Sequence, residues 1–131
     1  GFAHWMRVQH DEEVAHALKL FDFVNDRNGR VALQSISQPP IEFTSALEVM
    51  QHTLKHERQV TSMIDQLYNL AHSEKDNATH VLLEWFFEEQ VEEEKAVSDL
   101  IEQLKLVGDD GTGMLMLDAR LGERGPDENG S

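Results

Sequence analysis

Apolar side chains recur at intervals of three and four residues along three long stretches of the chain. This spacing is typical of helices that bury one face. The three predicted helices run roughly over residues 2–28, 45–74 and 77–108. Their ends carry recognisable signals, because Asn28-Gly29 favours a helix stop, Ser45 to Glu48 forms a capping box, and Asp76 can cap the third helix. The pattern therefore predicts an all-α protein.

The connections between these helices differ in length, which constrains their directions. The turn near Lys75 is so short that the second and third helices must be antiparallel. Residues 30–44 lack helical spacing and contain Pro39-Pro40, and such an extended connector can span about 50 Å. It can therefore run the length of a bundle, so that the first two helices are parallel. We predict a long-crossover helical bundle.

The C-terminal part of the sequence changes character after the third long helix. A glycine-rich break over residues 109–113 precedes a short amphipathic helix at residues 114–121. The last seven residues are polar and predict a disordered tail. We therefore expect one helical domain over residues 1–124 and a tail over residues 125–131.

Composition narrows the possible functions. The 131 residues contain 11 Lys and Arg against 25 Asp and Glu, for a net charge of −14. This charge repels nucleic acids and anionic membranes and attracts cations. The apolar runs are too short to cross a membrane and no signal segment opens the chain, so a cytoplasmic protein is expected. With no Cys and seven His, any metal must be bound by carboxylates and imidazoles.

Each long helix carries a glutamate on its apolar stripe. At 100° per residue, Glu13 and His16 lie on the inner face of the first helix, and Glu57 and Glu93 lie on those of the second and third. Glu57 and Glu93 are each 18 residues from Lys75, so an antiparallel pair brings them to one level. Glu13 falls at a similar level in a parallel arrangement. Buried carboxylates are costly, and no Lys or Arg lies on these stripes, so a multivalent cation is the expected neutralising partner.

Some of these residues have ordinary structural interpretations that involve no metal. Taken alone, Glu13-x-x-His16 is equally compatible with a hydrogen-bonded core histidine, although one helical turn also brings such a pair to one metal ion. Glu84, Glu88 and much of the acidic run at residues 92–94 fit a solvated face, but Glu93 does not. The remaining histidines show no comparable spacing and are interpreted as surface residues: His4, His10, His52, His56, His72 and His80.

Four segments together resemble the prokaryotic non-haem ferritins over nearly the whole length up to about Arg124. They are residues 1–7, 12–16, 55–57 and 88–94. The resemblance implies a ferritin-like bundle in which the three long helices are the family's second to fourth. It also implies a 24-subunit homo-oligomeric cage, with iron as the metal and neither nucleic acid nor membrane as partner.

The resemblance also implies roles for individual residues. Glu13 would bridge two irons, His16 would bind the first, and Glu57 and Glu93 would bind the second, with Gln90 close by. Bacterial members of the family have an additional iron site, and the resemblance assigns to it Glu12, Glu89 and Glu92 together with Glu93. Haem is not expected, because Val14 stands where bacterioferritins carry their haem-ligating Met.

One departure from the family pattern stands out. The family's first helix, with a glutamate ligand for the first iron, has no counterpart in these 131 residues. Either that helix was lost or a second chain supplies it, and the chain as given is expected to be an impaired ferroxidase.

Three functions are compatible with these residues. The leading hypothesis is iron storage, in which Fe(II) is oxidised by dioxygen or peroxide and stored as Fe(III) mineral. The second is a non-catalytic helical assembly or binding protein with a vestigial metal site. The third is a dinuclear oxidase or oxygenase for an organic substrate, because the same ligands can serve that chemistry.

Overall fold

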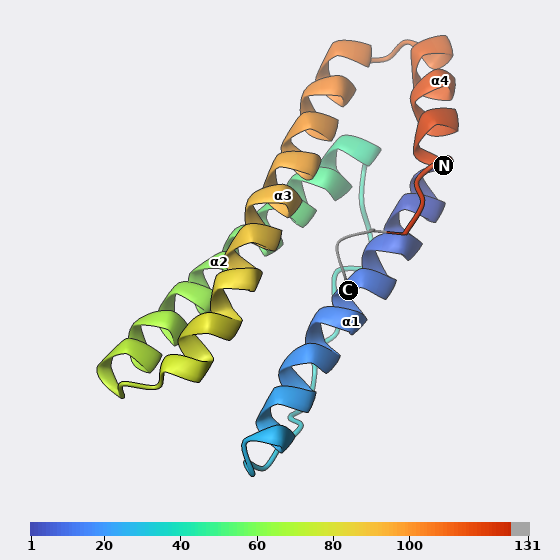
Figure 1. The fold of residues 1–131 in the computed structure, drawn as a ribbon. Coiled ribbons are helices and arrows are strands. Elements are labelled where there is room, and N and C mark those ends of the chain that lie inside the picture. Colours follow the sequence, from blue (N-terminus) through green and yellow to red (C-terminus); the bar gives the residue numbers. More distant parts are fainter. Residues whose placement is uncertain (127–131) are drawn as a thin grey trace. The chain divides into compact units, whose positions relative to one another are not determined.

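The structure is a computed structural model, and it describes residues 1–126. Within these residues it contains four α-helices and no strand (Figure 1). They are α1 (Phe2–Asp26), α2 (Ala46–Ser73), α3 (Asn77–Val107) and α4 (Gly111–Leu121). The all-α prediction is confirmed, and each long helix ends within about two residues of its expected position. Residues 29–43 form neither helix nor strand, as the missing helical spacing indicated.

The N-termini of α2 and α3 are capped by the side chains that the sequence indicated. The hydroxyl of Ser45 accepts a hydrogen bond from the Glu48 backbone nitrogen at 3.1 Å, and Asp76 accepts one from that of Thr79 at 3.2 Å. The Glu48 carboxylate reaches back one residue further than in a standard capping box. It accepts hydrogen bonds from the hydroxyl and the backbone nitrogen of Thr44. These hydrogen bonds lower the pKa of Glu48, and the one from the hydroxyl has the largest effect.

Each long helix is followed within two residues by a residue with positive φ. Asn28 has a φ of 61°, Lys75 of 55° and Gly108 of 56°. This backbone region costs energy for residues with a Cβ atom and suits glycine, and asparagine tolerates it better than most. The helix stop predicted at Asn28 is confirmed. The conformation of Lys75 carries no signal in the sequence, because lysine is a good helix former.

The start of α4 differs from the prediction. We expected a glycine-rich break up to Gly113, but the helix begins at Gly111. The Asp110 side chain accepts hydrogen bonds from the backbone nitrogens of Thr112 and Gly113, so the cap stabilises a first turn that the glycines alone disfavour. After α4, residues 125 and 126 are not helical. The remainder of the predicted tail, residues 127–131, lies outside the described residues.

The chain divides into two compact units, residues 1–41 with those from 109 onward, and residues 42–108. In the second unit, α2 and α3 form the predicted antiparallel hairpin (Figure 1). At its core Ile64, Leu83 and Phe86 are buried together. A single domain over residues 1–124 stays a prediction, and so does the parallel direction of the first two long helices.

In the first unit, α4 packs on the beginning of α1. The backbone nitrogen of Phe2 donates a hydrogen bond to Asp118 of α4 at 2.9 Å. Trp5 of α1 and Leu117 of α4 are buried. No helix within residues 1–126 is long and apolar enough to cross a membrane.

Candidate functional site

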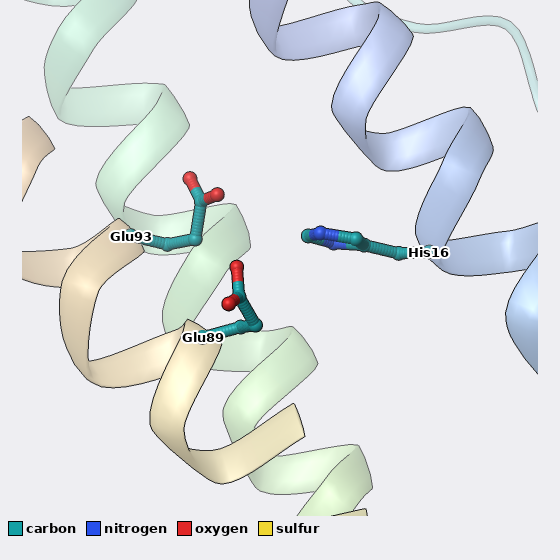
Figure 2. Close-up of side chains that lie close together, drawn as sticks. All are labelled: His16, Glu89 and Glu93. Carbon is teal, nitrogen blue, oxygen red and sulfur yellow. The ribbon is translucent and has the colours of Figure 1, made fainter. Parts of the chain in front are cut away.

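Three polar side chains of α3 are buried within four residues of one another. Glu89, Gln90 and Glu93 are only 5%, 3% and 7% exposed. Figure 2 shows Glu89 and Glu93, one helical turn apart, projecting from the same side of the helix. Each offers a carboxylate oxygen within 4.8 Å of one from the other. Glu92, which the resemblance also assigned to an iron site, is exposed, as are Glu84 and Glu88.

Glu57 of α2 joins this group across the hairpin. It is 3% exposed, and one of its carboxylate oxygens lies within 4.8 Å of one from Glu93. The prediction that an antiparallel pair brings these two glutamates to one level is confirmed. Two buried carboxylates this close repel each other, and a bound cation would relieve that repulsion.

Gln90 connects Glu57 to a second layer of polar side chains. Its amide nitrogen donates to Oε2 of Glu57 at 3.2 Å and to the hydroxyl of Thr61 at 3.1 Å. The Thr61 hydroxyl donates to Oε2 of Glu94 at 2.8 Å, and Arg58 lies 3.6 Å from the other oxygen of Glu94. Since a hydroxyl has one proton, donation to Glu94 leaves Thr61 as acceptor for Gln90.

Thr61 and Glu94 belong to this arrangement but were not among the site residues predicted from the sequence. Both lie one turn along their helices from a candidate residue, Thr61 from Glu57 and Glu94 from Gln90. That spacing was an available signal. Glu94 was instead interpreted as part of a solvated acidic run.

The first unit carries the other predicted ligands on α1. Glu12 and His16 are buried, and the Glu13 side chain is 38% exposed. Glu13 accepts a hydrogen bond from the Gln9 side chain at 3.4 Å, and its second oxygen lies 3.7 Å from Nδ1 of His16. The carboxylate and imidazole of the Glu-x-x-His pair are therefore neighbours on one helical turn. His16 extends from α1 in Figure 2.

Arg124 is a further charged residue of this unit, and it contacts α1 at three successive turns. One guanidinium nitrogen lies 2.9 Å from Oε2 of Glu12 and 3.0 Å from the Gln9 side-chain oxygen. Another donates to the backbone oxygen of Trp5 at 3.1 Å, and the guanidinium carbon lies 4.5 Å from the centre of the Trp5 ring. Arg124 follows α4, outside any periodic segment, so helical spacing could not predict this contact.

The remaining histidines largely follow the sequence interpretation. Five of them are exposed: His4, His10, His52, His56 and His72. His80 is half-buried, so the interpretation of it as a surface residue was wrong. Its ring stacks on that of Tyr68 with 3.7 Å between the centroids, because both residues lie near the turn of the hairpin.

Comparison with known proteins places this carboxylate-rich helical chain in a family. The sequence model of the Ferritin-like domain matches residues 1–107. The bacterial non-heme ferritin of Bacteroides fragilis is 39% identical over 124 residues, which cover 95% of this chain and 77% of that protein. The bacterial non-heme ferritin of Staphylococcus aureus is 37% identical over 128 residues, which cover 98% of this chain and 77% of that protein.

Solved structures give the same result. An engineered closed form of Archaeoglobus fulgidus ferritin matches with a TM-score of 0.92 and 45% identity, covering 95% of this chain and 76% of that one. The open pore ferritin of the same archaeon matches with a TM-score of 0.92 and 46% identity. The match covers 93% of this chain and 75% of that one.

The fold is that of the ferritin-like helical proteins. The chain belongs to the ferritin family. Family membership supports iron storage as the broad function and oxidation of Fe(II) as the associated activity, which agrees with the resemblance noted in the sequence.

Proposed function

We propose that this protein binds Fe(II) at a carboxylate-bridged dinuclear site, oxidises it with dioxygen or peroxide, and stores the Fe(III) product as mineral inside an oligomeric cage. The observation that carries the proposal is the pair Glu57 and Glu93. Both carboxylates are buried, and they offer oxygens within 4.8 Å of each other. Hard oxygen ligands at this separation suit a cation of high charge.

The proposed ligands are four of the residues that the family resemblance indicated. Glu13 bridges the two irons, His16 binds the first, and Glu57 and Glu93 bind the second. The relation of Glu13 to His16 within one turn of α1 supports their assignment to a common metal. The match to the Ferritin-like domain model includes all four of these residues.

In this reaction iron is the substrate. Each of two Fe(II) ions gives one electron to the oxidant, and the resulting Fe(III) is stabilised by the negative carboxylates. Gln90 is the neutral member of the site. Its hydrogen bond to Glu57 orients that carboxylate, so that less reorganisation is needed when iron binds.

Storage adds requirements beyond the metal ligands. We propose a homo-oligomeric cage of 24 subunits in the cytoplasm, without haem, nucleic acid or membrane as partner. The relatives at 37–39% identity are named non-heme ferritins, which supports the absence of haem together with Val14. The net charge of −14 suits a protein that attracts cations.

A polypeptide of residues 1–131 is proposed to oxidise iron slowly. The family resemblance assigns one ligand of the first iron to a helix that these residues do not contain, and oxidation depends on a complete, preorganised set of ligands.

The test is the initial rate of Fe(II) oxidation at a few irons per chain, measured by the absorbance of the ferric product. The 131-residue chain is compared with Glu57→Ala and with a version extended by an amphipathic helix carrying one inward glutamate. We expect the extended chain to be fastest and the alanine variant slowest. No difference between Glu57→Ala and the unaltered chain would favour a non-catalytic assembly protein with a vestigial site.

A further inference from the structure

Glu12 of α1 has an ion-pair partner that its assignment to an additional iron site does not anticipate. Its carboxylate is buried and lies 2.9 Å from the Arg124 guanidinium. The Arg124 side chain is itself only 22% exposed. An ion pair with little access to water is screened far less than one at the surface.

Arg124 is fixed in this place by more than the ion pair. Its guanidinium donates to the Gln9 side chain and to the Trp5 backbone oxygen, and it lies over the Trp5 ring. A cation that coordinates Glu12 must therefore either displace Arg124 from these partners or bind beside its positive charge. Both alternatives weaken metal binding at Glu12.

We propose that Arg124 is a specificity-determining residue that reserves Glu12 for a structural ion pair and so keeps this carboxylate out of iron coordination. The inference rests on the proposed function, because it concerns how many irons the site takes. Glu12 thereby supplies no ligand to an additional iron site, although the sequence resembles members that have one.

The experiment is an anaerobic calorimetric titration of the 131-residue chain with Fe(II), which counts the bound ions per chain. Glu12→Gln keeps an oxygen for Arg124 and removes the charge, and we expect the same iron count as in the unaltered chain. Arg124→Met removes the guanidinium, and we expect one additional Fe(II) per chain. The double variant Glu12→Gln/Arg124→Met is expected to lose that additional ion again.

Two controls separate the charge from the fold. Arg124→Lys keeps a positive charge, so the count should stay at that of the unaltered chain. Arg120→Met removes an exposed arginine from α4 and should change nothing. Circular dichroism checks the helical content of every variant, and if Arg124→Met does not fold, the Glu12→Gln result decides.

The possible failures are distinguishable. If Glu12→Gln loses one Fe(II), Glu12 is a ligand and the proposal is wrong. If Arg124→Met binds as many ions as the unaltered chain, Arg124 does not limit binding, and the dinuclear site still stands. If the unaltered chain binds no iron at all, the proposed function fails together with this inference.

Discussion

The side-chain amide of Gln90 on α3 donates a hydrogen bond to the carboxylate of Glu57 on α2, with 3.2 Å between Nε2 and Oε2. Both side chains are 3% exposed. A hydrogen bond to a charged acceptor in such surroundings is stronger than one at the surface, and it holds the acceptor in one orientation. This bond therefore links the packing of the hairpin to the geometry of the proposed iron ligand.

Replacing Gln90 by Leu removes this bond and keeps the volume similar. We expect Fe(II) binding to weaken by about tenfold, which corresponds to roughly 1.4 kcal/mol. Anaerobic titration calorimetry measures the affinity, and Gln66→Leu, at an exposed position of α2, is the control. An unchanged affinity in Gln90→Leu would mean that Glu57 is positioned without Gln90.

Thr61 can be tested through its hydroxyl, which connects Gln90 to Glu94. Thr61→Val has nearly the same shape but can neither accept from Gln90 nor donate to Glu94. We expect the free energy of unfolding to fall by about 1–2 kcal/mol. Urea unfolding provides the measurement. Thr61→Ser, which restores the hydroxyl, should recover most of the loss, and equal destabilisation by both variants would argue against the hydrogen bonds.

Glu57 allows binding and stability to be separated. Glu57→Gln keeps an oxygen that can accept from Gln90 and removes the buried charge. We expect Fe(II) binding at the second iron to be lost, while the metal-free variant melts at the same temperature as the unaltered chain or higher. Thermal melts in the presence of a chelator test this expectation. A markedly lower melting temperature would identify Glu57 as a structural residue.

The cap of α2 gives a dependence on pH. Hydrogen bonds from Thr44 lower the pKa of Glu48, so the charged carboxylate stabilises the folded state. This stabilisation is complete well above the ordinary glutamate pKa of about 4.3 and is lost as the pH falls through the lowered pKa. In Glu48→Gln the destabilisation should be clear at neutral pH and should vanish in acid. A difference in melting temperature that does not change with pH would show that the charge is not involved.

The sequence predicted the parts of this molecule that depend on spacing along the chain. Helical periodicity placed Glu57 and Glu93 on inner faces, and the short turn at Lys75 placed them at one level. Contacts that depend on a side chain's conformation were not predictable in the same way. Helical spacing places Thr61 one turn from Glu57 but does not show that its hydroxyl reaches Glu94, and Arg124 lies beyond the last helix, where no periodicity points to it.

The central claim is that iron binds at Glu13, His16, Glu57 and Glu93, and crystals soaked with Fe(II) test it most directly. Anomalous scattering measured at the iron edge locates the metal independently of the protein atoms. Because bonds from metal to oxygen are roughly 2 Å long, we predict peaks within about 3 Å of these carboxylates. A well-soaked crystal that shows no peak there, or shows iron only at the surface, would contradict the account.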